Sequence, residues 1–178
     1  MPLTQAVVLD AAMSLLDEVG LDELTTRRLA TRLNVRVGAL YWHYRNKQAL
    51  LDAVADRIIA EAAATPLPDA DWPDQLRALA GAQREAMLAH PDGARVVASM
   101  GAPGTQARAF FDRLIDILLT TGRDAGAAET GADVITSYVN GFTMEEQARK
   151  ANLLSRAERD RAFDAGLDVV LNGLRHTP

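Results

Sequence analysis

The sequence predicts an all-α protein in which an N-terminal three-helix head, built on a helix-turn-helix, precedes a larger helical body. Apolar residues recur along most of the chain at three- and four-residue steps, and no stretch shows sustained strand-type alternation. Aromatic residues make up only 5% of the chain, which also favours a helical protein. At 178 residues the chain is long enough to bury a substantial core.

Three helices are expected in the head. The first covers residues 4–18 and stops before Gly20, which suits the left-handed position after a helix. The second covers residues 25–33 and begins with a threonine, a favoured N-cap. Asn34 can adopt the left-handed conformation that turns the chain into the third helix, expected over residues 37–44.

Six further helices are expected in the body. Asn46 can cap the first of them, and the proline-rich stretch 65–73 ends it because proline removes a donor and restricts its predecessor. Glycine-containing turns come before the third, fourth and fifth of them. The expected helices cover residues 47–63, 74–89, 94–100, 105–123, 128–153 and 157–174.

A cationic segment stands out in an acidic chain. The formal net charge is −5, yet residues 25–51 hold six Arg or Lys and no Asp or Glu. Blocks of like charge are often solvated helix faces, and without the helix-turn-helix pattern that interpretation would be preferred. With the pattern, the segment indicates a surface that binds phosphate groups.

Catalysis and metal binding find almost no support. The absence of cysteine excludes disulfides, thiolate metal sites and cysteine nucleophiles. Ser99 has no nucleophile-elbow setting, and no phosphate-binding glycine loop follows a strand. His90 beside Asp92 could suggest a metal or catalytic site, but His-Pro-Asp-Gly is also a good turn between helices, and we favour the turn. We therefore expect no enzyme, no cofactor and no metal site.

The chain shows no sign of export or membrane insertion. Its first residues lack the basic and apolar regions of a secretory signal. No apolar run approaches the roughly 18 residues that a membrane span needs. We expect a cytoplasmic protein without a membrane partner.

The helix-turn-helix over residues 25–47 predicts double-stranded DNA as a partner. In such motifs the second helix enters the major groove, about 12 Å wide, while the first crosses the backbone. The exposed start of the second helix then needs small or polar residues, and its inner face needs apolar ones. The residues at the exposed start are Arg36, Val37, Gly38 and Ala39. Leu40 and Tyr44 form the inner face.

The residues of this motif resemble the DNA-binding head of the TetR family of transcriptional repressors. The resemblance is carried by Leu-Thr-Thr-Arg-Arg-Leu-Ala at residues 24–30 and Leu-Tyr-Trp-His-Tyr-Arg-Asn-Lys at residues 40–47. It is strong over residues 3–63 and weaker beyond. Membership of this family would imply an all-helical homodimer, with a DNA-binding head over residues 1–46 and a ligand-binding and dimerisation body over residues 47–178.

The resemblance also implies roles for single residues of the head. Arg27 matches a position that reaches a base, while Val37, Gly38 and Ala39 match the base-facing side of the recognition helix. Val37 and Ala39 can make only apolar contacts, for example with a thymine methyl. We therefore expect the operator sequence to differ from that of the family member that the head resembles most. The positions that match phosphate contacts are Thr26, Tyr41, His43 and Lys47. For Trp42 we expect packing against the first helix.

In the body, the resemblance points to a small-molecule site. Members that bind a metal–drug complex use a histidine and a glutamate, where this chain has Val97 and Glu145. Because the imidazole is missing, we expect an apolar pocket with few polar groups and no metal. Its expected lining residues are Leu79, Gln83, Met87, Met100, Phe110 and Tyr138. These side chains could equally be bundle core.

The resulting hypothesis is a ligand-responsive repressor that releases a palindromic operator when a small molecule binds its body. Helices 128–153 and 157–174 would form a four-helix bundle across the dimer axis. A rival hypothesis is a small-molecule binding protein that acts through protein contacts without sequence-specific DNA binding. An enzyme built on a helical bundle is the third.

Overall fold

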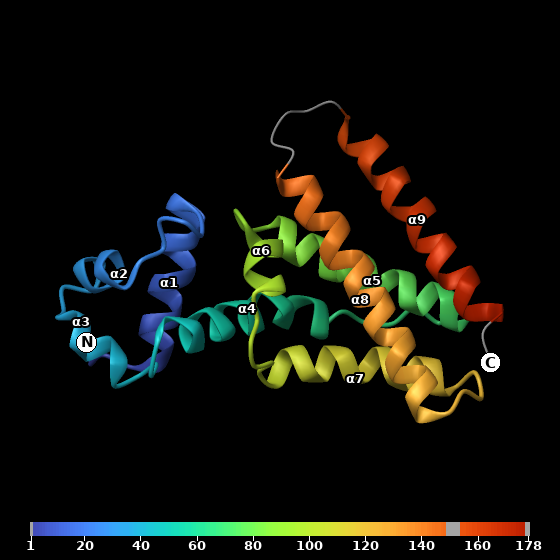
Figure 1. The fold of residues 1–178 in the computed structure, drawn as a ribbon, viewed down its shortest axis with the longest axis horizontal. Coiled ribbons are helices and arrows are strands. Elements are labelled where there is room, and N and C mark those ends of the chain that lie inside the picture. Colours follow the sequence, from blue (N-terminus) through green and yellow to red (C-terminus); the bar gives the residue numbers. More distant parts are fainter. Residues whose placement is uncertain (1, 149–153, 177–178) are drawn as a thin grey trace.

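The computed structural model describes residues 2–148 and 154–176. Within these ranges the chain forms nine α-helices and no strand, which confirms the predicted all-α fold class (Figure 1). A small group of helices at the N-terminal end stands apart from a larger group, and one long helix connects the two. The described part of the chain contains no helix long and apolar enough to cross a bilayer.

Three short helices form the head. Their bounds are α1 (Gln5–Val19), α2 (Thr26–Arg32) and α3 (Val37–Tyr41). Leu16, Leu29 and Leu40 are buried on their inner faces, where they fill the core of the head. The third helix ends three residues earlier than predicted, although the N–H of Tyr44 still donates to the carbonyl of Leu40 (2.9 Å).

The turns of the head depend on the residues predicted to form them. Thr25 caps α2, because its hydroxyl oxygen accepts from the N–H of Arg28 (3.2 Å). Asn34 adopts the left-handed conformation with φ 53°. Gly20 has φ 76°, and a Cβ at this position would lie 2.9 Å from the carboxylate of Asp92. The head is therefore shaped by local signals that the sequence carries.

Six helices form the body. Their bounds are α4 (Lys47–Ala63), α5 (Trp72–Leu88), α6 (Gly93–Ala98), α7 (Thr105–Leu119), α8 (Ala125–Ala148) and α9 (Arg156–His176). Asn46 caps α4 as predicted, accepting from the N–H of Ala49 (2.8 Å). Helix α4 packs against α1 at one end and against α5, α6 and α7 further along. It thus belongs to both the head and the core of the body.

Several boundaries in the body differ from the prediction, and two of the differences have a local cause. Helix α5 begins at Trp72 because Pro73 occupies its first turn, where a missing N–H costs nothing. Only the earlier prolines, Pro66 and Pro68, lie in the break that precedes it. Helix α7 ends at Leu119 because Gly122 turns the chain with φ 86°. The predicted end of the next helix, over residues 149–153, lies outside the described residues.

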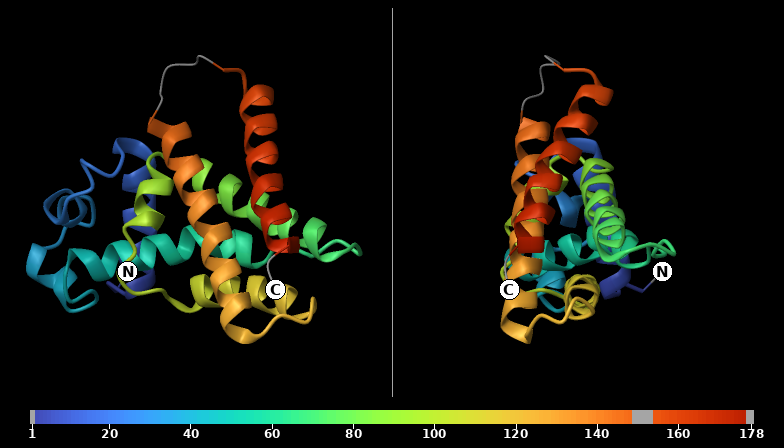
Figure 2. Two further views of the ribbon diagram at one scale, coloured as in Figure 1. Left: turned by 45° about the vertical axis from the view of Figure 1, so that its right-hand side comes forward. Right: turned by 90° about the vertical axis from the view of Figure 1, so that its right-hand side faces the viewer.

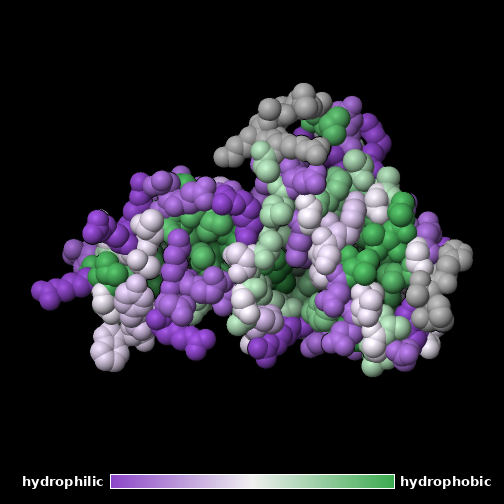
Figure 3. Space-filling model, viewed as in Figure 1, coloured by the Kyte–Doolittle hydropathy of each residue, from purple (hydrophilic) through white to green (hydrophobic). Residues whose placement is uncertain are grey.

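Helices α8 and α9 lie side by side as an outer layer of the body, which Figure 2 shows from two directions. Each buries one face, with Ile135 and Val139 on α8 and Leu167 on α9. Val134 on α8 and Val169 on α9 are exposed to solvent. Figure 3 shows apolar surface over these two helices, in contrast to the mostly hydrophilic head.

Candidate nucleic-acid interface

The start of α3 presents a nearly bare helix surface. Arg36, the N-cap residue, and Gly38 are exposed, while Val37 and Ala39 are half-buried. Leu40 is buried on the opposite side, where it packs α3 against the rest of the head. This is the arrangement predicted for a recognition helix, with small or polar residues outward and an apolar residue inward.

Two of the six cations of the basic segment are already paired within the head. Arg28 bonds to Glu23 (2.6 Å), and Arg32 bonds to both carboxylate oxygens of Glu18 (2.6 and 2.7 Å). The hydrogen bond from Arg32 lowers the pKa of the Glu18 carboxyl. Within the described residues no ion pair joins an acid to the other four cations. These are Arg27, Arg36, Arg45 and Lys47, all of them exposed.

The aromatic run at the end of α3 is divided between surface and core. Tyr41 is 48% exposed, as expected for a side chain one residue away from the inner face. Tyr44 is half-buried, and its hydroxyl donates to the carbonyl of Gln5 (3.3 Å). The side chain of Gln5 in turn donates to the carbonyl of His43 (2.9 Å). These bonds attach the end of the recognition helix to the start of α1.

The expectation that Trp42 packs against the first helix is wrong. Trp42 is 89% exposed, the largest exposed apolar side chain of the head. The inner side of α3 is filled by Leu40 and Tyr44, and Trp42 follows the end of the helix on the outward side. Its indole therefore lies on the same end of the molecule as the unpaired cations.

Replacing Trp42 with phenylalanine is expected to change the free energy of unfolding by less than about 0.5 kcal/mol, because surface substitutions rarely do more. Urea denaturation measures this change. Trp72→Phe is the matched control and is expected to lose more stability. The ring of Trp72 is half-buried, and its centroid lies 5.5 Å from the guanidinium of Arg123 and 5.8 Å from that of Arg175. A loss above about 1 kcal/mol for Trp42→Phe would show that its indole supports the head.

The turn between α1 and α2 is bonded to the body. The N–H of Leu21 donates to the carboxylate of Asp92 (3.0 Å), and Asp22 bonds to Arg95 (2.8 Å). Asp17 bonds to the ring of His90 (2.7 Å). His90 and Asp92 thus lie in the turn before α6, as the sequence indicated, and connect this turn to the head. In the described part of the chain no group of three or more His, Asp or Glu could hold a metal.

A second set of contacts, which was not predicted, joins α4 to the segment over residues 99–107. Gln48, Asp52 and Asp56 stand four residues apart on one face of this helix. Gln48 donates to the carbonyl of Ser99 (2.9 Å), Asp52 accepts from the N–H of Gly101 (2.9 Å), and Asp56 accepts from the N–H of Ala107 (2.8 Å). The polar four-residue spacing was visible in the sequence, but its partners are about 50 residues away. We call these three residues the α4 ladder.

The residues proposed for a ligand site lie on three helices and one loop of the body. Leu79, Gln83 and Met87 are buried on α5 and Phe110 is buried on α7, whereas Met100 is half-buried before α7. The half-buried Tyr138 on α8 donates its hydroxyl to the carbonyl of Phe163 (2.7 Å), and burial raises the pKa of that hydroxyl. Val97 is buried on α6.

Gln83 differs from these apolar neighbours. Its side chain is 3% exposed, and its Nε2 donates to the amide oxygen of Asn140 on α8 (2.9 Å). Its Oε1 is buried and has no hydrogen-bond partner within the described residues. A buried polar atom without a partner costs about 1–3 kcal/mol, so this position favours a hydrogen-bonding group nearby.

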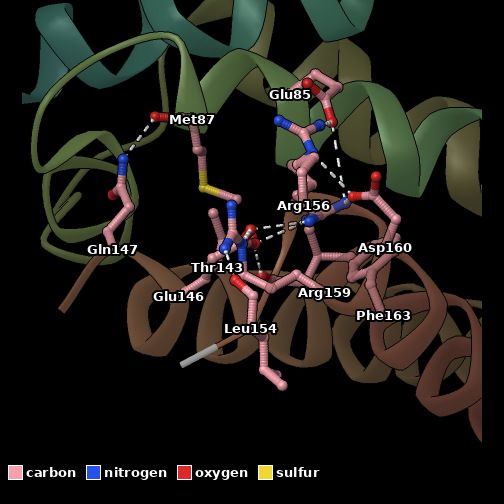
Figure 4. Close-up of polar contacts among 12 residues, drawn as sticks. Glu85, Met87, Thr143, Glu146, Gln147, Leu154, Arg156, Arg159, Asp160 and Phe163 are labelled. Carbon is pink, nitrogen blue, oxygen red and sulfur yellow. Dashed lines mark hydrogen bonds and ion pairs between the residues drawn. The ribbon is translucent and has the colours of Figure 1, made fainter. Parts of the chain in front are cut away.

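A cluster of charged side chains joins α5 to α8 and α9. Arg84 on α5 bonds to Glu146 on α8 (2.9 Å) and to Asp160 on α9 (2.8 Å). Arg159 on α9 also bonds to Glu146 (2.8 Å), and Figure 4 shows the Arg159 and Glu146 side chains facing each other. The neighbouring Glu145 is exposed. The two adjacent glutamates therefore point to different surroundings, as helical geometry requires.

Fold and site together define a DNA-binding regulator of the helix-turn-helix class, with a basic head attached to a helical body. Comparisons with known proteins identify the family. Residues 8–54 match the family model of the bacterial regulatory proteins of the tetR family. Residues 65–159 match the model of the tetracyclin repressor-like C-terminal domain. The chain belongs to the tetR family of bacterial regulatory proteins. This is a family of transcriptional regulators and not of enzymes.

Similar proteins cover nearly the whole chain. The tetracycline repressor protein class A from transposon 1721 of Escherichia coli is 38% identical over 94% of this chain and 88% of its own length. The structure of BioQ with its natural double-stranded DNA operator has a TM-score of 0.87 at 35% identity, covering 99% of this chain and all of that one. A TetR variant from Acinetobacter baumannii AYE in complex with minocycline has a TM-score of 0.86 at 38% identity. The match covers 98% of this chain and 97% of that one.

Proposed function

We propose that this chain is a homodimeric, ligand-responsive repressor that binds a palindromic DNA operator and releases it when a small molecule binds the body. The observation that carries this proposal is the exposed, unpaired basic surface of the helix-turn-helix in a chain of the tetR family. The relatives solved with a DNA operator and with minocycline support the two halves of the proposal. The protein would act in the cytoplasm, as expected from the sequence.

In this proposal the head divides its contacts between bases and phosphates. The start of α3 faces the base edges, and Arg27 at the exposed start of α2 reaches toward them. The expected phosphate contacts surround this surface and come from Thr26, Tyr41, His43 and Lys47. The exposure of Tyr41 and Lys47 supports this role, whereas Thr26 and His43 are half-buried.

Two sets of contacts would transmit ligand binding to the head. The α4 ladder holds α4 to residues 99–107, and Asp92 with Arg95 holds the start of α6 to the α1–α2 turn. A ligand that moves α6 or the loop after it therefore shifts both attachments at once. Heads of a dimer must be about 34–36 Å apart to enter successive major grooves, so a change in spacing favours release.

The proposed effector is a largely apolar molecule that needs no metal. The buried Leu79, Met87 and Phe110 favour an apolar compound, and Met residues adapt to irregular shapes. Val97 replaces the imidazole that a metal–drug complex would need. The outer faces of α8 and α9, with Val134 and Val169 exposed, are the proposed dimer surface.

Replacing both Arg27 and Tyr41 with alanine is expected to weaken operator binding at least about 10-fold, because a base contact by arginine contributes about 1–3 kcal/mol and a phosphate contact adds to it. The operator is first recovered by selection from a random-sequence duplex library at low salt. Binding is then measured by fluorescence anisotropy on that duplex. Circular dichroism and sedimentation are expected to show an unchanged fold and oligomeric state.

Arg77→Ala is the matched control, because it removes a half-buried arginine from the body, far from the head in sequence. It is expected to leave operator affinity unchanged. If the native protein recovers no preferred sequence, the repressor proposal is wrong and the alternative of a ligand-binding protein without specific DNA binding is supported. If the double variant binds as tightly as the native protein, the assignment of the head surface is wrong.

A further inference from the structure

One long polar side chain stands at the N-cap of the recognition helix. Arg36 is exposed, its side chain caps no backbone group, and no ion pair holds it within the described residues. Its backbone is extended, with φ −76° and ψ 146°, so the side chain leaves the chain where α3 begins. In helix-turn-helix proteins, the N-terminal residues of this helix contact base edges.

The next three positions offer no hydrogen-bonding side chain. Val37 and Ala39 are apolar and half-buried, and Gly38 has no side chain. Nothing inside the chain requires that glycine, because its φ is not positive and a Cβ there would meet no atom within 4 Å. Glycine in a helix is unfavourable, so its use at an exposed position favours close approach of another molecule. A bare surface lets α3 lie deep in the groove, with Arg36 at the base edges.

The other cations of the head are placed differently. Arg28 and Arg32 are bound to glutamates of the head itself. Arg27 lies in the first turn of α2, so it reaches toward the bases from the helix that crosses the DNA backbone and not from the recognition helix. Arg45 and Lys47 follow α3 and lead into α4, beyond the turn that faces the base edges. Hydrogen-bond readout from the start of the recognition helix therefore depends on Arg36.

We propose that Arg36 determines operator specificity by binding one guanine in each half-site, donating two N–H groups to its O6 and N7. This inference rests on the proposed DNA-binding function. The planar fork of arginine matches these two acceptors, and this pair is the commonest specific contact in the major groove. Val37 and Ala39 beside it provide apolar contact for a thymine methyl, so the guanine is the position that the recognition helix itself reads by hydrogen bonds.

The first test compares the sequences that variants select. The full-length native protein, Arg36→Ala and Arg45→Ala each select from one random-sequence duplex library at the same salt concentration. The native protein and Arg45→Ala are expected to recover an inverted repeat with the same invariant guanine in each half-site. Arg36→Ala is expected to lose that preference while the remaining positions persist. Arg45→Ala is the matched control, since it also removes one exposed arginine from the head.

The second test addresses the guanine atoms. Replacing the selected guanine by 7-deazaguanine removes the N7 acceptor and leaves the base pair intact. The native protein is expected to lose affinity for this duplex by about 5-fold or more, within the discrimination that one bidentate contact provides. Arg36→Ala is expected to bind both duplexes equally, since the contact is already missing.

The outcomes separate this inference from the function on which it rests. A native protein that recovers no preferred sequence overturns the repressor proposal and this inference with it. A native protein that selects an operator whose guanine preference survives in Arg36→Ala overturns the inference alone. So does an Arg36→Ala variant that binds every sequence more weakly to the same degree, because arginine would then contact only phosphate.

Discussion

Replacing Arg84 with methionine is expected to lower the free energy of unfolding by about 3–5 kcal/mol, the cost of breaking a buried ion pair from one side. Arg84 is 4% exposed, and its guanidinium donates to both oxygens of Glu146 (2.9 Å each) and to Asp160 (2.8 Å). The Glu146 side chain is 6% exposed. In the variant its carboxylate keeps only Arg159 as a charged partner (2.8 Å). Urea denaturation at neutral pH measures the loss.

Arg77→Met is the matched control. Arg77 also bonds to two carboxylates, those of Asp74 and Asp168, but its side chain is 39% exposed. An exposed pair contributes at most about 1 kcal/mol, so this variant is expected to lose far less stability than Arg84→Met. Similar losses of unfolding free energy in the two variants would show that burial does not increase the contribution of the Arg84 cluster to stability.

The pH dependence provides a second measurement on the same pair of variants. Burial by itself raises the pKa of Glu146, but hydrogen bonds from Arg84 and Arg159 outweigh burial and leave the pKa below its ordinary value. The ionised carboxylate therefore stabilises the fold above its unfolded pKa of about 4.3. This contribution is lost as the pH falls through the lower, folded pKa. The native protein and Arg77→Met are expected to show that loss, and Arg84→Met is expected to show less of it.

Gly93→Ala is expected to destabilise the protein by about 1–3 kcal/mol, the usual cost of forcing atoms into a filled space. A Cβ at Gly93 would lie 2.2 Å from the carbonyl oxygen of Met87 and 3.0 Å from its carbonyl carbon. Because these are backbone atoms, the start of α6 has to move away from α5. Asp92 and Arg95 hold the head at that point, so operator affinity is expected to fall as well. Thermal unfolding and anisotropy on the selected operator measure the two effects.

Gly81→Ala is the control for this glycine, because a Cβ at Gly81 in α5 would meet nothing within 4 Å. It is expected to stabilise the protein by about 0.5–1 kcal/mol, since alanine is the better helix former. The two substitutions therefore have opposite expected signs. A neutral or stabilising Gly93→Ala would mean that the α5–α6 turn adapts without cost.

The helix caps and turns of the head were predictable because their signals are local. Thr25 and Asn46 cap helices by bonds to N–H groups three residues ahead, and Asn34 turns the chain through its own backbone conformation. The same locality explains the agreement for α4, whose predicted range matches its bounds. Pro73 misled the boundary prediction because proline both ends helices and suits their first turn.

The candidate site was predictable only in part. Arg36 and Gly38 could be placed on an exposed surface because the motif itself defines that side of α3. Trp42 could not, since an aromatic residue after a helix can face either way, and the choice depends on which neighbours already fill the core. The α4 ladder was missed because its backbone partners are about 50 residues away along the chain.

The sequence by itself determined that this protein is all-helical, that its head is a helix-turn-helix, and to which family it belongs. These conclusions rest on periodicity, caps and motif residues within a few positions of one another. Only the tertiary structure decided which cations remain unpaired, and that Glu18 and Glu23 neutralise Arg32 and Arg28. It also decided that Glu146 faces Arg84 in the core. Charge pairing and burial depend on distances between segments, and those distances exist only once the helices have packed.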